Sequence, residues 1–132
     1  MSTPVTAQAL APILVIEDEP SVIAFLRAAL ERKGYKVENA ASGSAGLDLL
    51  KTGKYGGVIS DIRMPGTING AEVHAWIQMN LPELATRIIL ISGDTANSET
   101  QSLLERSGTP CIEKPFRVQH LISVVERTFG KP

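Results

Sequence analysis

Five short strand-like runs alternate with five segments of helical pattern, and this alternation constrains the fold more than any other feature. The runs are Ile13–Ile16, Lys36–Ala40, Gly57–Ser60, Arg87–Ile91 and Thr109–Ile112. Helical periodicity is expected near 20–33, 44–51, 70–80, 96–106 and 117–129. Strands that alternate with helices of about 10–15 residues indicate a parallel sheet with right-handed crossovers. We therefore predict one α/β domain with a doubly wound, five-stranded parallel sheet and five helices.

Apolar spacing predicts which side chains of each helix face the core. In the first, third and last helices they are Phe25, Leu26, Ala29 and Leu30; Val73, Trp76 and Ile77; and Val118, Leu121, Ile122, Val125 and Phe129. The fourth helix offers only Ala96, Thr100, Leu103 and Leu104. We expect this helix to be the most shallowly anchored of the five.

Length and charge exclude several classes of function. The 132 residues carry 13 basic and 14 acidic side chains without a basic stripe, which argues against nucleic-acid binding. No apolar stretch approaches the roughly 20 residues of a membrane span. Residues 1–11 lack the features of a secretory signal and are expected to be a flexible leader to a domain over 12–129, with 130–132 as a tail. The lone Cys111 suits a reducing compartment, so we expect a cytoplasmic protein.

Polar side chains follow four of the five apolar runs, where each strand is expected to end. They are the pair Glu17–Asp18, then Asp61, Ser92 and Lys114. In an open parallel sheet, ligands bind outside the carboxyl ends of the strands. Two carboxylates about 4 Å apart repel by about 4 kcal/mol at an effective dielectric of about 20, so such a cluster needs a cation. Oxygen ligands favour Mg²⁺ over zinc.

Asp61 is the best candidate nucleophile, because it ends a central strand and precedes a turn-rich loop. A carboxylate can accept a phosphoryl group as an acyl phosphate. Lys114 supplies a compact positive charge for a phosphate oxygen, and the Ser92 hydroxyl can donate to another. Taken singly, each residue also fits a turn, a cap or a solvated side chain; together the set favours phosphoryl chemistry.

Four segments, in this order, resemble the receiver domain of two-component response regulators. They are Val15-Ile16-Glu17-Asp18-Glu19-Pro20, Ser60-Asp61-Ile62-Arg63-Met64-Pro65-Gly66, Ile91-Ser92-Gly93-Asp94 and Glu113-Lys114-Pro115-Phe116. The resemblance covers about residues 12–129 and implies a flavodoxin-like fold with strand order 2-1-3-4-5. It also implies a signalling module rather than an enzyme, phosphorylated by a histidine kinase or a histidine phosphotransfer protein.

The resemblance implies a role for each matching residue. Asp61 would accept the phosphoryl group. Mg²⁺ would be held by Asp18, Asp61 and the backbone carbonyl of Arg63, with Glu17 acting mostly through water. Ser92 and Lys114 would bind the phosphoryl group. The bond before Pro115 is expected to be cis, which X–Pro bonds permit at low cost.

Three departures from the family pattern are visible. Cys111 stands where the family usually has an aromatic switch residue, so coupling through a swinging ring is not expected. The loop Gly66-Thr67-Ile68-Asn69-Gly70 is one residue longer than the commonest form, as in receivers of hybrid sensor kinases. Glu17 replaces an aspartate, and its longer arm should still reach a metal-bound water.

Three further hypotheses concern surfaces around the site. Arg63 and Asp94 each lie two residues beyond a site residue, and as a pair they would form a lid that slows attack by water. Val22 and Ile23 would help to dock the phosphodonor. The fourth helix, fifth strand and fifth helix would form the face for an unknown output partner or a homodimer. His74 and His120 are expected at the surface or the rim.

The sequence also has to be weighed against other functions. A Mg²⁺-dependent phosphohydrolase would place a second carboxylate two residues after its nucleophile, where this chain has Arg63. A receiver that is no longer phosphorylated would act only as a docking module. A dinucleotide-binding loop is disfavoured, because no G-x-G-x-x-G follows the first strand. A free-standing regulator and a fragment of a hybrid kinase fit the sequence equally well.

Overall fold

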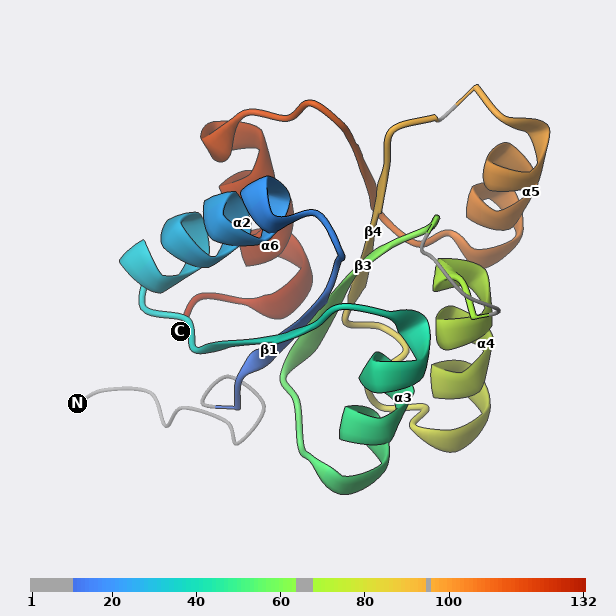
Figure 1. Cartoon of the computed structure of the whole chain (residues 1–132), viewed down its shortest axis with the longest axis horizontal. Helices are drawn as coiled ribbons and strands as arrows, with labels where there is room; N and C mark the ends of the chain where they lie inside the picture. Colours follow the sequence, from blue (N-terminus) through green and yellow to red (C-terminus); the bar gives the residue numbers. More distant parts are fainter. Residues whose placement is uncertain (1–10, 64–67, 95) are drawn as a thin grey trace.

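A five-stranded parallel sheet forms the centre of the computed structural model, which describes residues 11–63, 68–94 and 96–132 (Figure 1). Its strands are β1 (Ile13–Ile16), β2 (Val37–Ala40), β3 (Gly57–Asp61), β4 (Ile88–Ser92) and β5 (Cys111–Glu113). The strand order is β2-β1-β3-β4-β5, and every neighbouring pair is parallel. The predicted flavodoxin-like sheet is therefore confirmed.

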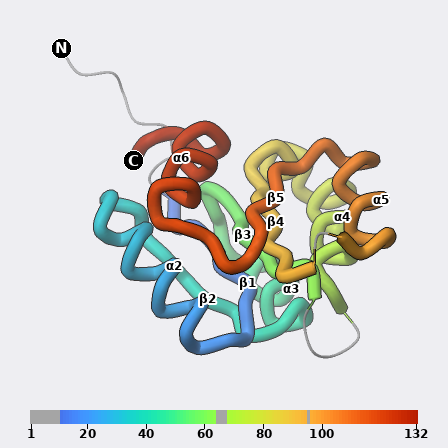
Figure 2. The backbone as a smooth tube through the Cα atoms, turned by 90° about the horizontal axis from the view of Figure 1, so that it is seen from above, coloured from blue at the N-terminus to red at the C-terminus, as the bar shows by residue number. Residues whose placement is uncertain are grey.

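Helices cover both faces of this sheet. They are α2 (Pro20–Arg32), α3 (Gly43–Thr52), α4 (Gly70–Asn80), α5 (Ser98–Ser107) and α6 (Val118–Phe129). Helices α2 and α6 pack together on one face, and α3, α4 and α5 lie on the other, as Figures 1 and 2 show. The structure thus has three layers, and both faces of its central strands are buried.

The position of β1 between two layers of helices explains why this strand is apolar at every position. Ile13 and Val15 belong to the core cluster beneath α2 and α6, whereas Leu14 and Ile16 belong to the cluster beneath α3 and α4. Successive side chains of a strand point to opposite faces, so a strand covered on both faces needs apolar side chains throughout. The same alternation holds in β4, and it fixes the register of the sheet.

Local signals set the ends of several helices. Pro20 is the first residue of α2, where its missing N–H costs nothing. Asn69 caps α4 by accepting from Glu72 N at 3.0 Å, and Asn97 caps α5 by accepting from Glu99 N and Thr100 N. Gly108 ends α5 in the left-handed region at φ +65°. These caps place the starts of α4 and α5 just beyond the carboxyl ends of β3 and β4.

Several side chains predicted to face the core do not. Phe25 is 38% exposed and Val118 is 45% exposed, because both lie at the margin of the stripe that packs on the sheet. Ala96 is exposed and precedes α5. Trp76 is only partly buried, but it packs against the core cluster beneath α3 and α4, as predicted. In α5 only Thr100 and Leu103 are buried, which agrees with the predicted shallow anchoring of this helix.

The prediction that His74 lies at the surface or the rim is wrong, because the structure buries this side chain. It is 3% exposed, and its Nε2 lies 2.8 Å from the Thr109 hydroxyl in the segment between α5 and β5. Burial lowers the pKa of His74 from its ordinary value. His120 is exposed, as predicted. The contact between His74 and Thr109 therefore ties α4 to the segment that leads into β5.

Some predictions fall outside the described residues. They include the leader up to residue 10, the loop positions Met64, Pro65, Gly66 and Thr67, and with them the proposed extra loop residue. Among the helices that are described, none has the length and apolarity needed to cross a bilayer.

The buried imidazole gives a pH-dependent stability that can be measured. The folded-state pKa of His74 lies below its unfolded value of about 6.5, so the folded protein binds fewer protons. Its contribution to stability is present above pH 6.5 and is lost as the pH falls through the folded pKa. Urea unfolding should show that His74→Gln loses less stability than the wild type between neutral and mildly acidic pH. The exposed His120→Gln is the control, and an unchanged pH profile in His74→Gln would contradict this explanation.

Candidate functional site

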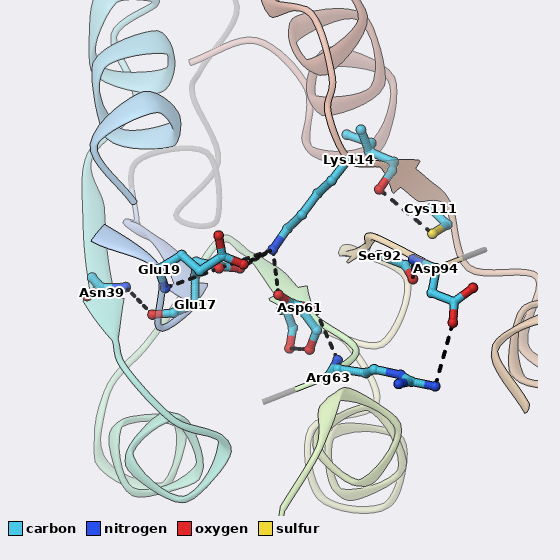
Figure 3. Close-up of polar contacts among 11 residues, drawn as sticks. Glu17, Glu19, Asn39, Asp61, Arg63, Ser92, Asp94, Cys111 and Lys114 are labelled. Carbon is cyan, nitrogen blue, oxygen red and sulfur yellow. Dashed lines mark hydrogen bonds and ion pairs between the residues drawn. The ribbon is translucent and has the colours of Figure 1, made fainter. Parts of the chain in front are cut away.

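Five polar side chains converge at the carboxyl edge of the sheet (Figure 3). Glu17 directly follows β1, Asp61 and Ser92 are the last residues of β3 and β4, and Lys114 directly follows β5. Glu19 lies just before α2. Because β1, β3 and β4 are neighbours in the sheet, residues far apart in sequence meet at one edge. The sequence predicts this convergence for four of the five side chains, Glu17, Asp61, Ser92 and Lys114.

The ammonium of Lys114 forms the centre of the site. Its Nζ lies 2.7 Å from Asp61 Oδ2, 3.2 Å from Glu17 Oε1 and 3.3 Å from Glu19 Oε1. One lysine therefore contacts three carboxylates from different parts of the chain (Figure 3). Glu17 follows β1, Asp61 ends β3, and Glu19 precedes α2. The opposite charges offset the repulsion that three neighbouring carboxylates would otherwise cause.

Burial and charge together set the protonation of this cluster. Glu17 is fully buried, and burial, reinforced by the neighbouring Asp61, raises its pKa to about 7 although Lys114 opposes the change. Burial by itself lowers the pKa of Lys114, but its hydrogen bonds and ion pairs with Asp61 and Glu17 raise it above the ordinary value. Lys114 is therefore a cation at neutral pH, whereas Glu17 holds a proton more readily than an ordinary carboxyl group does.

The carboxylate of Asp61 is held at both oxygens. Oδ2 accepts from Lys114, and Oδ1 accepts from the backbone N–H of Arg63 at 3.0 Å. The next residue, Ile62, is held at both backbone groups: its N–H donates to the Ile91 carbonyl, and its carbonyl accepts from Gly70 N. Asp61 is thus presented in one orientation by β4 and by the start of α4.

Ser92 lies on the other side of Asp61 from the two glutamates (Figure 3). The residue is buried, and its hydroxyl oxygen accepts from the backbone N–H of Asp94 at 3.0 Å. Its backbone carbonyl accepts from Lys114 N at 2.8 Å, which joins the ends of β4 and β5. Ser92 therefore occupies the predicted edge of the site, with its hydroxyl hydrogen free to rotate toward a ligand.

The acidic side chains fit a hard divalent cation. Carboxylate oxygens of Glu17, Glu19 and Asp61 lie within 4.8 Å of one another, and Mg²⁺ prefers such oxygen donors. Asp18 is exposed and is not one of the three carboxylates in this group, which was found among the described residues. A metal role for Asp18 and for the Arg63 carbonyl therefore stays a prediction.

Two residues of the site were not predicted. Glu19 completes the acidic run before Pro20, but by its position it could equally be an acid at the start of a helix. Asn39 donates through Nδ2 to the carbonyl of Val15 at 3.0 Å and, more weakly, to that of Glu17 at 3.5 Å. The only sequence feature that could have indicated a role for Asn39 is that its side chain is polar within the short strand β2. Asn39 helps to fix the backbone that presents Glu17.

The remaining predicted positions surround this centre. Arg63 Nη2 and Asp94 Oδ2 lie 3.8 Å apart, with both side chains at least half exposed. The bond between Lys114 and Pro115 is cis, as predicted. Val22 and Ile23 are partly buried at the start of α2.

An aromatic pair joins the same helix to the segment before α6, with Phe25 exposed and Phe116 half-buried. The rings of Phe25 and Phe116 meet edge to face, with centroids 5.5 Å apart. Together with Glu19, Val22 and Pro115, they line a shallow pocket that reaches Lys114.

Cys111 lies half-buried on the edge strand β5. Burial, together with the charges of Glu113 and Asp61, raises the pKa of its thiol to about 11. Such a thiol is protonated at neutral pH, so it packs as a small apolar group.

Fold and site together define a doubly wound α/β domain that gathers carboxylates and a lysine at the carboxyl ends of its strands. Residues 13–126 match the family model of the response regulator receiver domain, and the chain belongs to this family. The family forms part of two-component signalling systems, so the chain is a signalling domain.

Similarity to individual proteins agrees with this assignment. The chain is 31% identical over 111 residues to the response regulator ArlR of Staphylococcus haemolyticus, a match that covers 84% of this chain and 49% of that protein. The fold resembles the chemotaxis protein CheY4 of Vibrio cholerae with a TM-score of 0.79, at 26% identity, over 91% of this chain and 99% of that one. It also resembles the receiver domain of a histidine kinase from Syntrophus aciditrophicus, with a TM-score of 0.80, at 27% identity, over 90% of this chain and 89% of that one. This chain spans about half the length of ArlR.

Gly70 offers a test of how tightly the site is packed. A Cβ at Gly70 would lie 2.7 Å from Ile62 Cα and would also collide with the Asp61 carbonyl, both rigid backbone groups. Gly70→Ala should therefore lower the free energy of unfolding by about 1–3 kcal/mol, measured in urea. Gly93→Ala, whose Cβ would meet nothing within 4 Å, should change it by less than about 0.5 kcal/mol. Equal effects of the two substitutions would contradict the packing described for Asp61.

Proposed function

We propose that this domain receives a phosphoryl group on Asp61 from a histidine kinase or a histidine phosphotransfer protein. The observation that carries the proposal is the 2.7 Å contact between Asp61 Oδ2 and the Lys114 ammonium at the carboxyl edge of the sheet. The contact joins a carboxylate nucleophile to a cation suited to a phosphate oxygen. Membership of the receiver family supports the same assignment.

The transfer is a single displacement at phosphorus. A carboxylate oxygen of Asp61 bonds to phosphorus as the phosphorus–nitrogen bond of the donor phosphohistidine breaks. The electron pair of that bond returns to the imidazole ring, which is the leaving group. Lys114 neutralises charge on the phosphoryl oxygens, and the Ser92 hydroxyl donates to one of them. Asp61 is already oriented for this step by its hydrogen bond from Arg63 N.

Mg²⁺ is the proposed cofactor, and it would offset the negative charge that gathers when a phosphoryl group approaches several carboxylates. The residues that would hold it are Glu17, Asp18, Asp61 and the backbone carbonyl of Arg63. The oxygen-rich group of Glu17, Glu19 and Asp61 supports this choice of cation.

Phosphorylation is proposed to bias the face formed by α5, β5 and α6. Ser92 joins β5 through the bond from Lys114 N, and α5 contributes few buried side chains. A hydroxyl drawn toward the phosphoryl group would therefore act on a weakly anchored helix. The same face would bind the output partner or a second copy of the chain, and Val22 and Ile23 would dock the phosphodonor.

A receiver that is never phosphorylated is the alternative function. The presence of Asp18, Asp61, Ser92 and Lys114 together argues against it, and its support is limited to Cys111, which stands where the family usually has an aromatic switch residue. A phosphohydrolase finds less support, since Arg63 stands where its general acid–base carboxylate would be.

Labelling with acetyl phosphate and Mg²⁺ tests the phosphoacceptor directly. We expect the mass of the intact protein to rise by one phosphoryl group, and Asp61→Asn to abolish the increase. Asp48→Asn, an exposed carboxylate on α3, is the matched control and should label like the wild type. Absence of labelling in the wild type would favour the docking module, whereas steady release of phosphate from a monoester would favour the hydrolase.

The pair Arg63–Asp94 is proposed to act as a lid over the phosphoryl group. Because both side chains are exposed, the pair is worth at most about 1 kcal/mol, which limits its effect to about fivefold. Arg63→Ala and Asp94→Ala should each shorten the half-life of the phosphorylated protein within that range. Arg27→Ala and Glu31→Ala, which break a similarly exposed pair on α2, are the controls. An unchanged half-life in both Arg63→Ala and Asp94→Ala would rule out the lid.

A further inference from the structure

The three donors of the Lys114 ammonium have three carboxylate partners. An ammonium group carries three N–H donors and no acceptor. Its partners in this structure are Asp61, Glu17 and Glu19. A phosphoryl oxygen can therefore bind Lys114 alongside Asp61 Oδ2 only if one of the two glutamates gives up its position.

Burial distinguishes the three partners. The side chain of Glu17 is fully buried, and that of Asp61 is 7% exposed. The side chain of Glu19 is 57% exposed and lies 3.3 Å from Nζ, compared with 2.7 Å for Asp61. Removing a buried carboxylate from its cation is far more costly than releasing an exposed one into water. Glu19 is therefore the partner that leaves at the lowest cost.

The backbone of Glu19 is fixed at the start of α2, whereas its carboxylate takes no part in capping that helix. Glu19 is the N-cap residue of α2; its carbonyl accepts from Ile23 N at 3.0 Å, and its N–H donates to Glu17 Oε1 at 3.3 Å. Its carboxylate makes no capping hydrogen bond to the helix. The side chain can therefore rotate away from Lys114 without disturbing α2 or Glu17.

We propose that Glu19 is the displaceable counter-ion of Lys114, which occupies the position that a phosphoryl oxygen takes when Asp61 is modified. The inference rests on the proposed phosphoacceptor function and assigns a further positioning residue to the same site. Glu19 lowers the affinity for the phosphoryl group in two ways, because it competes for Lys114 and adds a negative charge. It also lines the pocket with Val22, Phe25 and Phe116, so its release occurs on the side where this pocket opens.

The first measurement is the affinity for beryllofluoride, which mimics a phosphoryl group on a carboxylate oxygen, in saturating Mg²⁺. Glu19→Gln should bind it about two- to fivefold more tightly than the wild type, the range expected for an exposed ion pair. Glu113→Gln is the matched control, since this exposed carboxylate directly precedes Lys114 and forms no ion pair with it among the described residues. The control should retain the affinity of the wild type.

The second measurement needs neither metal nor phosphoryl group. The exchange of the Lys114 ammonium protons with water is followed by ¹⁵N NMR in the metal-free protein. Glu19→Gln should speed this exchange, because one of three carboxylate partners is lost, and Glu113→Gln should not. A purely structural role of Glu19 at the start of α2 would change the stability but leave the exchange unaltered.

Each outcome decides the proposal. Unchanged affinity and unchanged exchange in Glu19→Gln would overturn it. Weaker binding of both Mg²⁺ and beryllofluoride would also overturn it, because Glu19 would then serve the metal. If the wild type binds no beryllofluoride, the phosphoacceptor function fails, and the exchange rate alone decides whether Glu19 is the displaceable partner of Lys114.

Discussion

The ion pair between Lys114 and Asp61 is the interaction on which the arrangement of the site depends. It connects the residue after the edge strand β5 to the end of the central strand β3, across the intervening β4. The same ammonium contacts Glu17, which follows β1 and is fully buried. Without this cation, buried carboxylates would face one another without compensation, at a cost of several kcal/mol. The lysine is therefore both a structural partner of the resting site and the proposed ligand of the phosphoryl group.

This double role is how, in the proposed function, an acidic site remains folded and accepts a phosphoryl group. Before phosphorylation, carboxylates bind all the donors of the Lys114 ammonium. Carboxylate oxygens that the ammonium releases are suitable ligands for Mg²⁺. In the proposed displacement, one anion is exchanged for another at the same cation. The exposed Glu19 makes such an exchange cheaper than the displacement of Glu17, because water takes over its solvation.

The sequence was most informative where burial is complete. The strands of the central sheet are apolar at nearly every position, so their number, order along the chain and approximate limits could be predicted. Asp61, Ser92 and Lys114 could be predicted because each interrupts an apolar pattern at a strand end. Glu19 could not, since the contact that defines it depends on how the side chain of Lys114 extends across the sheet.

Errors arose at helix margins and at polar groups in the core. Phe25 and Val118 fit the apolar stripe of a helix, but the edge of the sheet leaves them exposed. Apolar periodicity does not show which face of α4 a polar side chain such as His74 occupies. Its hydrogen-bond partner Thr109 is also remote in sequence. Contacts between distant segments decide these positions, and local pattern carries no information about them.

A double-mutant cycle on the free energy of unfolding, in chelator-treated protein, tests the central ion pair most directly. Lys114→Met, Asp61→Asn and the double variant would be unfolded in urea at neutral pH. A direct, largely buried pair predicts a coupling energy of at least about 1 kcal/mol between the two positions. Effects that add within about 0.5 kcal/mol would show that Lys114 and Asp61 do not interact in the folded protein, and the structure of the site described above would then be wrong.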